Sequence, residues 1–235
     1  MEALPLPIVA VVGCDGSGKS TLTNDLLRHF RDKGSCELVY LGQSSGNIAN
    51  RIQGLPWIGE SIARYLARKA ERTHANEHQR RAPDIPTALA IYLLSQWRAF
   101  KFRRMLARVR AGGIVITDRY PQAEVPSFHF DGPGLVDADS GTWFVRKLAA
   151  HESRLYHWMA GYRPALIVRL DIDADTAHSR KPDHKLSTLR RKAAVIPTLK
   201  FNGARILDLD GRDPYPVVLD AAVRGAEAAL DVGAN

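Results

Sequence analysis

One short stretch, Gly13 to Thr21 (GCDGSGKST), limits the chain to a small number of folds. It fits the template G-x-x-x-x-G-K-[ST], with an apolar run before it and an amphipathic helical pattern after it. Its glycines permit backbone angles that turn successive N–H groups toward one point, where the following helix also begins. The stretch therefore predicts a loop that binds phosphate groups, placed between a buried strand and a helix.

The polar side chains of this loop have separate expected roles. Lys19 can reach the β- and γ-phosphates of a nucleotide, and the hydroxyl of Ser20 can bind Mg²⁺, so we expect ATP and Mg²⁺ as cofactors. Asp15 is a carboxylate among anion-binding groups, so it either faces an acceptor, a metal or a basic partner, or orients the loop backbone. The expected nucleotide-binding residues of the loop are Gly13, Asp15, Gly16, Ser17, Gly18, Lys19, Ser20 and Thr21.

Apolar runs of strand length alternate with longer helical patterns along the chain, which favours an α/β fold. Consecutive apolar residues at Ile8–Val12 and Leu166–Val168 indicate strands covered on both faces. The predicted strands are Ile8–Gly13, Glu37–Leu41, Gly113–Asp118, Ala165–Leu170 and Ala204–Leu209. The predicted helices are Lys19–Arg31, about Ile58–Thr73, Pro86–Arg110, about Thr142–Ala160, Ala174–Arg180, Lys185–Leu199 and Tyr215–Leu230.

Length and charge narrow the class of protein. The 235 residues contain nothing like a flexible linker, so we expect a single domain over residues 1–235. No run of about 18 apolar residues and no secretory signal is visible, and Cys14 and Cys36 have no metal or disulfide spacing, so a cytoplasmic location is expected.

The net charge of +8 suits a small anionic partner or a solvated basic surface. Aromatic residues do not interleave with the basic ones, so nucleic acid is not an expected partner; a homodimer is compatible with this composition.

A second motif, GIVITDRY at Gly113–Tyr120, is an apolar strand that ends in Asp118, Arg119 and Tyr120. A carboxylate at the end of a strand beside the phosphate loop can hold Mg²⁺ or contact an acceptor hydroxyl. The adjacent guanidinium can bridge the phosphates of donor and acceptor. Taken alone, such an Asp–Arg pair is usually structural, and its position after a phosphate loop favours the functional interpretation.

These motifs together resemble the thymidylate kinase group of nucleoside monophosphate kinases, over most of the chain. That family has a loop G-x-[DE]-G-x-G-K-[ST], a long helix with A-D-R, a strand G-x-[IV]-[IV]-x-D-R-Y, and an L-D-[IV] strand end that leads into a basic lid. The matching stretches are GCDGSGKST, SQWR at Ser95–Arg98, GIVITDRY, RLDID at Arg169–Asp173 and ILDLDGRD at Ile206–Asp213. The resemblance implies an ATP-dependent kinase with the P-loop NTP hydrolase/kinase fold, a five-stranded parallel sheet flanked by helices.

The resemblance also implies the positions of the two substrates. Gly211 and Arg212 would lie near the base of ATP. The acceptor would be bound by Gln96, Arg98, Arg119 and Tyr120.

A lid is expected at about residues 173–192, where basic residues follow the fourth strand. The residue after Asp15 is Gly16, so the loop carries no arginine of its own, and a lid cation is the natural partner for charge on the transferred group. We expect Arg180 in this role, then Arg190 or Arg191; the alternative is that these side chains solvate a helix. The expected catalytic residues are then Lys19, Asp15, Asp118, Arg119 and Arg180.

The identity of the acceptor stays open. The family follows its second strand with an Arg-Glu-Pro segment, whereas Leu41–Gly46 has neither charge, and a basic helical insertion follows at about residues 50–82. The many arginines favour an anionic acceptor, such as a nucleotide. A nucleoside or sugar hydroxyl is the alternative, with Asp15 or Asp118 as base. Outside the kinases, a nucleotide-dependent switch or ATPase and a basic accessory protein are the other candidates.

Overall fold

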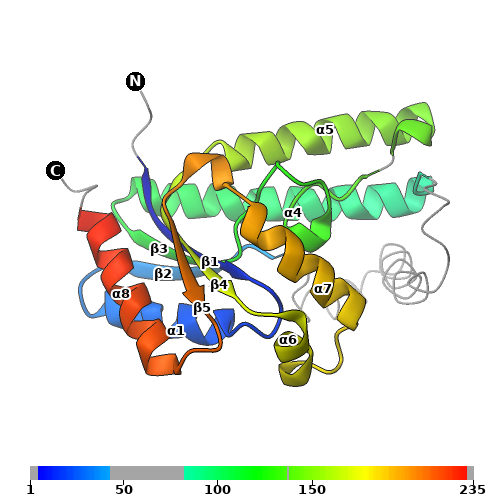
Figure 1. Ribbon diagram of the computed structural model, residues 1–235. Coiled ribbons are helices and arrows are strands. Elements are labelled where there is room, and N and C mark those ends of the chain that lie inside the picture. The colour runs from blue at the N-terminus through cyan, green and yellow to red at the C-terminus, as the bar shows by residue number, and fades with distance from the viewer. Residues whose placement is uncertain (1–4, 43–81, 137, 232–235) are drawn as a thin grey trace, which may run out of the picture.

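A computed structural model of the protein describes residues 5–42, 82–136 and 138–231 (Figure 1). The helix expected at about Ile58–Thr73 and almost all of the insertion expected at about 50–82 lie outside the described residues. One five-stranded sheet has the order β2-β3-β1-β4-β5, and every pair of neighbours is parallel. Its strands are β1 (Leu6–Gly13), β2 (Cys36–Tyr40), β3 (Ile114–Asp118), β4 (Pro164–Asp171) and β5 (Ile206–Asp210). The predicted α/β fold with a five-stranded parallel sheet is confirmed.

Six α-helices of the described residues connect and cover these strands. They are α1 (Lys19–Arg31), α4 (Ile85–Arg110), α5 (Trp143–Ala160), α6 (Ala174–Arg180), α7 (Leu186–Val195) and α8 (Tyr215–Asp231). Short 3-10 turns lie at η2 (Phe128–Phe130), η3 (Ala138–Ser140), η4 (Ile196–Thr198) and η5 (Phe201–Gly203). The helix predicted at Lys185–Leu199 is shorter than expected, because Pro197 has no N–H to continue the α-helical hydrogen bonds and the chain tightens into η4.

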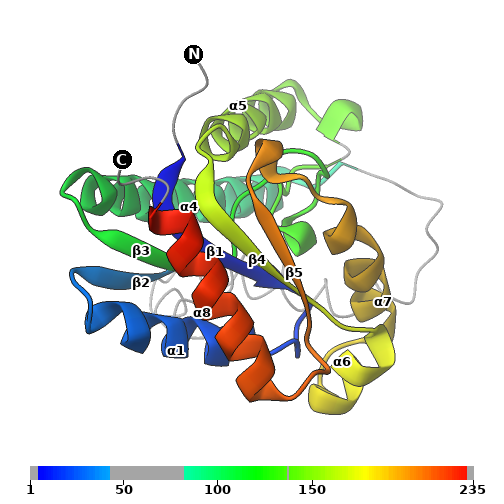
Figure 2. The ribbon, with the colours of Figure 1, turned by 60° about the vertical axis from the view of Figure 1, so that its left-hand side comes forward.

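Helices cover both faces of the sheet, which explains the consecutive apolar residues of β1. Ile8 and Ala10 point toward α4 and α5, whereas Val9 and Val11 point toward α1 and α8. Figure 2 shows the two pairs of helices on opposite sides of the strands. Within the described part of the chain, no helix is both long and apolar enough to cross a membrane.

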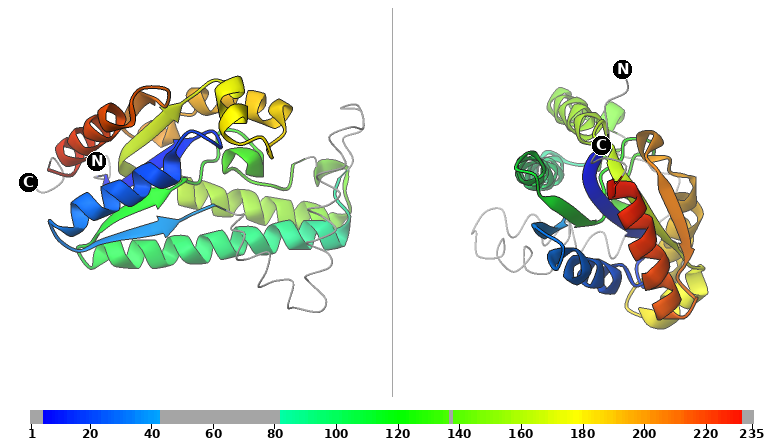
Figure 3. Two further views of the ribbon diagram at one scale, coloured as in Figure 1. Left: turned by 90° about the horizontal axis from the view of Figure 1, so that it is seen from below. Right: turned by 90° about the vertical axis from the view of Figure 1, so that its left-hand side faces the viewer.

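The strand order brings the expected motifs to one edge of the sheet. Strand β1 lies between β3 and β4, and Val11 is in register with Asp118 at the end of β3. The loop that follows β1 therefore lies beside the ends of both neighbours, where open parallel sheets bind their ligands. Figure 3 shows α6 and α7 at this same edge, beyond the end of β4.

Candidate active site

The phosphate-binding loop has the backbone that its glycines predict. Gly16 and Gly18 have φ angles of 88° and 92°, in the left-handed region. A Cβ atom at Gly16 would lie 2.8 Å from the carbonyl oxygen of Ala177, so a larger residue does not fit. Gly18 caps α1 without a side-chain hydrogen bond, which leaves the first N–H groups of the helix directed at the loop. The loop and helix together form an anion-binding site.

Lys19 lies inside this loop and is 6% exposed. Its Nζ donates a hydrogen bond of 2.6 Å to the carbonyl oxygen of Cys14. Burial lowers the pKa of Lys19 to about 8; the positive charge of Arg119 acts in the same direction and the carboxylate of Asp15 acts against it. A phosphate bound beside this buried ammonium group would stabilise its charged form.

Ser20 and Asp118 meet as the two motifs predict. The Ser20 hydroxyl donates a hydrogen bond of 3.1 Å to Oδ2 of Asp118. The other carboxylate oxygen, Oδ1, is buried and has no hydrogen-bond partner among the described residues. A hydroxyl beside a buried, unpartnered carboxylate oxygen is a donor set that suits Mg²⁺. The described residues form no group of three or more His, Cys, Asp and Glu side chains that could hold a metal ion.

Asp15 is bound by two cations and has a histidine nearby. Arg119 Nη2 lies 2.7 Å from its Oδ1, Lys192 Nζ donates to its Oδ2, and His184 Nδ1 lies 3.7 Å from the same oxygen. Burial alone would raise the pKa of Asp15, but the charges of Arg119 and Lys192 outweigh it and hold the pKa far below its usual range. Asp15 therefore stays ionised and joins the loop to the end of β3 and to helix α7.

The structure brings Arg98 and Arg119 together, around a third residue. Arg98 Nη2 lies 2.5 Å from Oδ1 of Asp131, and Arg119 Nη1 lies 3.5 Å from Oδ2. Arg98 also donates a 2.9 Å hydrogen bond to the Asp131 carbonyl oxygen. Burial would raise the pKa of Asp131, but the two guanidinium groups lower it below the ordinary value. Sequence reasoning did not single out Asp131; its only signal was an acidic residue in the Gly- and Pro-rich segment after β3.

Gln96 and Tyr120 lie apart from this charge network. The Tyr120 ring packs against Phe102, and its hydroxyl donates a 2.8 Å hydrogen bond to the Tyr162 carbonyl oxygen. Its side chain therefore belongs to the core beneath the site. Gln96 is half-buried on α4, two positions before Arg98.

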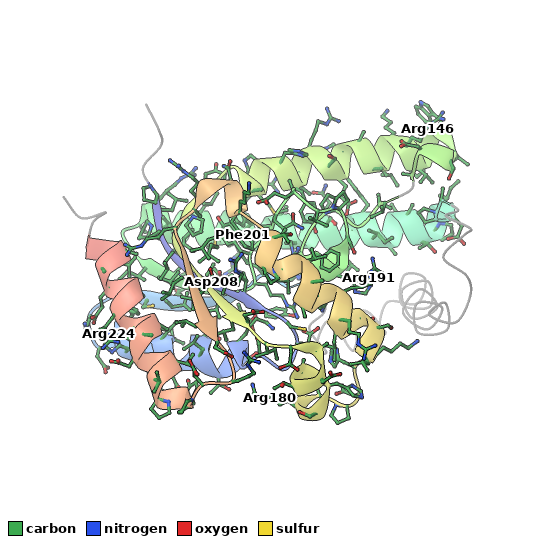
Figure 4. All side chains as sticks on the ribbon, in the orientation of Figure 1. Arg146, Arg180, Arg191, Phe201, Asp208 and Arg224 are labelled. Atoms are coloured by element: carbon green, nitrogen blue, oxygen red, sulfur yellow. The ribbon has the colours of Figure 1, made fainter. Side chains whose placement is uncertain are left out.

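Arg180 lies on the side of the loop where the nucleotide base is expected. It is the last residue of α6 (Figure 4). Its Nη1 donates to the carbonyl oxygens of Gly211 at 2.9 Å and Gly16 at 3.4 Å. Arg212 is exposed, and its guanidinium binds the carboxylates of Asp210 and Asp173. Next to them is a cavity of about 290 Å³, lined by Ser17, Gly18, Leu22, Leu170, Arg180, Gly211, Asp213, Tyr215 and Val218. Thr21 is exposed on the first turn of α1.

Besides Arg180, the cation of residues 173–192 that contacts the loop is Lys192. Arg190 and Arg191, which the sequence favoured over it, are exposed, whereas Lys192 is 7% exposed and faces Asp15. A signal existed in the sequence: Lys192 follows the apolar Leu189 by three positions, so both lie on the inner face of α7.

Comparison with known proteins finds two similar ATP-binding proteins from Escherichia coli. No family model matches it. It is 50% identical over 230 residues to the uncharacterized ATP-binding protein YghS of Escherichia coli (strain K12). These residues make up 98% of this chain and 96% of YghS. It is 42% identical over 216 residues to the uncharacterized ATP-binding protein YghR of the same strain. These residues make up 92% of this chain and 84% of YghR. The chain therefore belongs to the family of the ATP-binding proteins YghS and YghR.

Proposed function

We propose that this protein is an ATP-dependent phosphotransferase that moves the γ-phosphoryl group of ATP to a small acceptor. The observation that carries the proposal is the convergence of three elements on one loop: Lys19 inside it, Asp118 at the end of β3 through Ser20, and Lys192 from the lid through Asp15. The names of YghS and YghR as ATP-binding proteins support the nucleotide.

Different residues of the site would bind different parts of Mg·ATP. The N–H groups at the start of α1 and Lys19 hold the phosphates. Ser20 and Asp118 would hold Mg²⁺, which would supply positive charge to offset that of the phosphates. Catalysis in such a site comes from positioning and charge stabilisation, because phosphoryl transfer needs little covalent help from the protein.

The lid residues have two places in this scheme. Arg180, between the carbonyl oxygens of Gly16 and Gly211, closes the site on the side of the base, beside the cavity near Tyr215. Lys192, beside Asp15, is on the side of the loop that Arg119 faces. Lys192 is therefore the lid cation that we assign to the transferred group, and Arg180 the one that we assign to the nucleotide.

A screen of ATP consumption tests the proposal. Purified protein is supplied with ATP, Mg²⁺ and, in turn, nucleosides, sugars, nucleoside monophosphates including dTMP, and phosphorylated sugars. We expect ADP formation to depend on one acceptor class and to be abolished by Lys19→Ala, whereas Lys33→Ala, an exposed change just after α1, leaves it unchanged. Hydrolysis at the same rate without any acceptor would favour an ATPase or switch, and turnover that survives Lys19→Ala would remove this loop from the mechanism.

A further inference from the structure

Asp131 stands between the two arginines that the family resemblance assigns to the acceptor. Its carboxylate lies 2.5 Å from Arg98 and 3.5 Å from Arg119, one oxygen toward each. The Arg98 side chain is 1% exposed, so it has little freedom to turn to another partner. A carboxylate therefore already occupies the place where these guanidinium groups would bind an anionic acceptor.

The backbone conformation and hydrogen bonds around Asp131 fix its carboxylate between the two arginines. Asp131 and Arg119 have φ angles of 62° and 72°, in the left-handed region that residues with a side chain rarely adopt. Gln122, fully buried, donates from Nε2 to the carbonyl oxygens of Val125 at 2.7 Å and Phe130 at 3.0 Å. Such a conformation persists only where its surroundings hold it, which separates this carboxylate from a surface residue that happens to lie near two arginines.

The charged side chains of this network nearly balance one another, because Asp131 and Asp15 pair with its arginines and with Lys192. The cations of the described network are Lys19, Arg98, Arg119 and Lys192, and its carboxylates are Asp15, Asp118 and Asp131. These side chains sum to one excess positive charge, before the charges of ATP, Mg²⁺ and Arg180 are added. A phosphomonoester carries about 1.5 to 2 further negative charges at neutral pH.

The cation nearest to Arg98 along α4 is engaged as well. Lys101 Nζ donates to the carbonyl oxygens of Tyr40 at 2.8 Å and Gly42 at 2.9 Å, at the end of β2. This is the strand after which the resembled family carries its Arg-Glu-Pro segment. At the described part of that edge, Lys101 is thus committed to main-chain oxygens.

We infer that Asp131 replaces an acceptor phosphate at this site, so that the acceptor is a neutral hydroxyl compound, such as a nucleoside or sugar, and not a phosphomonoester. The inference rests on the proposed phosphotransferase function and names its substrate class. The reaction balances without another reactant: the acceptor oxygen bonds to the γ-phosphorus, the bond from that phosphorus to the β–γ bridging oxygen breaks, and ADP leaves. The hydroxyl proton is released to water, because phosphoryl transfer through a loose transition state does not require a strong base.

The first arm of the test uses the wild-type protein. ADP formation is measured at saturating ATP and Mg²⁺ with hydroxyl acceptors and with the matching monophosphates. We expect kcat/KM for the best hydroxyl acceptor to exceed that for its monophosphate by about 100-fold, as expected when a buried like charge opposes the wrong substrate. A wild-type preference for a monophosphate overturns the inference and leaves the phosphotransferase proposal standing.

The second arm measures binding and needs no turnover. Inorganic phosphate is titrated calorimetrically into protein saturated with Mg²⁺ and a non-hydrolysable ATP analogue, so that the loop at Lys19 is already filled. We expect Asp131→Asn, which frees both arginines at nearly constant shape, to bind phosphate about tenfold or more tightly than the wild type. Asp139→Asn is the control for the change in net charge, because Asp139 is exposed in η3.

The two arms separate the two proposals. If no acceptor is phosphorylated but Asp131→Asn gains phosphate binding, the phosphotransferase proposal fails and the assignment of Asp131 stands. Wild-type protein that binds phosphate as tightly as the variant overturns the inference. Thermal melting checks that each variant folds; if Asp131→Asn does not, Asp131→Ser takes its place and the wild-type arm still decides.

Discussion

Lys192 of helix α7 and Asp15 of the phosphate-binding loop form an ion pair, although 177 positions separate them in the chain. Both side chains are largely buried, so the attraction between them is screened far less than that of a surface pair. The pair holds helix α7 against the loop. Under the proposed function, Lys192 adds a positive charge beside Arg119, where charge would develop on the transferred phosphoryl group.

Replacement of Lys192 tests this contact between α7 and the loop. Lys192→Met keeps much of the side-chain volume and removes the charge, so we expect kcat to fall about 100-fold or more while KM for ATP changes little. Lys192→Arg keeps the charge and should recover part of the rate. Steady-state kinetics measure both, with Lys147→Met, an exposed change on α5, as control. Equal rates for Lys192→Met and the control would contradict the assignment.

The lowered pKa of Lys19 predicts that nucleotide binding takes up protons. Burial sets this pKa at about 8, so the free protein loses the Lys19 charge as the pH rises through that value. A triphosphate favours the charged form, so affinity for Mg·ATP should fall above pH 8, and binding at pH 8 should take up about half a proton. Calorimetry in buffers of different ionisation enthalpy measures this uptake. Lys19→Arg stays charged and should show no proton uptake. Zero proton uptake by the wild type would contradict the prediction.

The contact between Ser20 and Asp118 predicts how nucleotide affinity depends on Mg²⁺. Asp118→Asn removes the carboxylate charge beside the Ser20 hydroxyl, so the gain in ATP affinity that Mg²⁺ provides should shrink about 10- to 100-fold. Affinity for ATP in EDTA should change much less. Titrations with and without Mg²⁺ measure the difference, and Asp220→Asn, exposed on α8, should keep the full gain. An unchanged gain in Asp118→Asn would place the metal elsewhere.

The buried amide of Gln122 predicts a stability effect. Besides donating to two carbonyl oxygens, its Oε1 accepts hydrogen bonds from the N–H groups of Glu124 at 2.6 Å and Val125 at 2.8 Å. Gln122→Ala leaves these groups buried without partners, so we expect the free energy of unfolding to fall by about 2–4 kcal/mol. Ser127→Ala, which removes one hydrogen bond to His129 N in the same segment, should cost about 1 kcal/mol or less. Urea denaturation of the two variants decides whether Gln122 organises this loop.

Local patterns were sufficient for the strands, for α1 and for the loop between β1 and α1. Each of these depends on residues that are close in sequence: consecutive apolar side chains in Ile8–Val12, and glycines at the positions that need a left-handed backbone. The meeting of Ser20 with Asp118 was predictable for the same reason. Parallel strands end at a common edge, so two motifs that each follow a strand end come together there.

Burial and long-range pairing were decided only by the tertiary structure. Leu89 and Leu93 fit the helical period of α4 but are 41% and 38% exposed, while Arg98 on the same helix is buried beside Asp131. The sequence by itself determined which segments form strands and helices and where phosphate can bind, because those properties depend on neighbouring residues. Which charge meets which depends on the packing of α4, α7 and the loop after β3 against one another, and no local pattern contains that information.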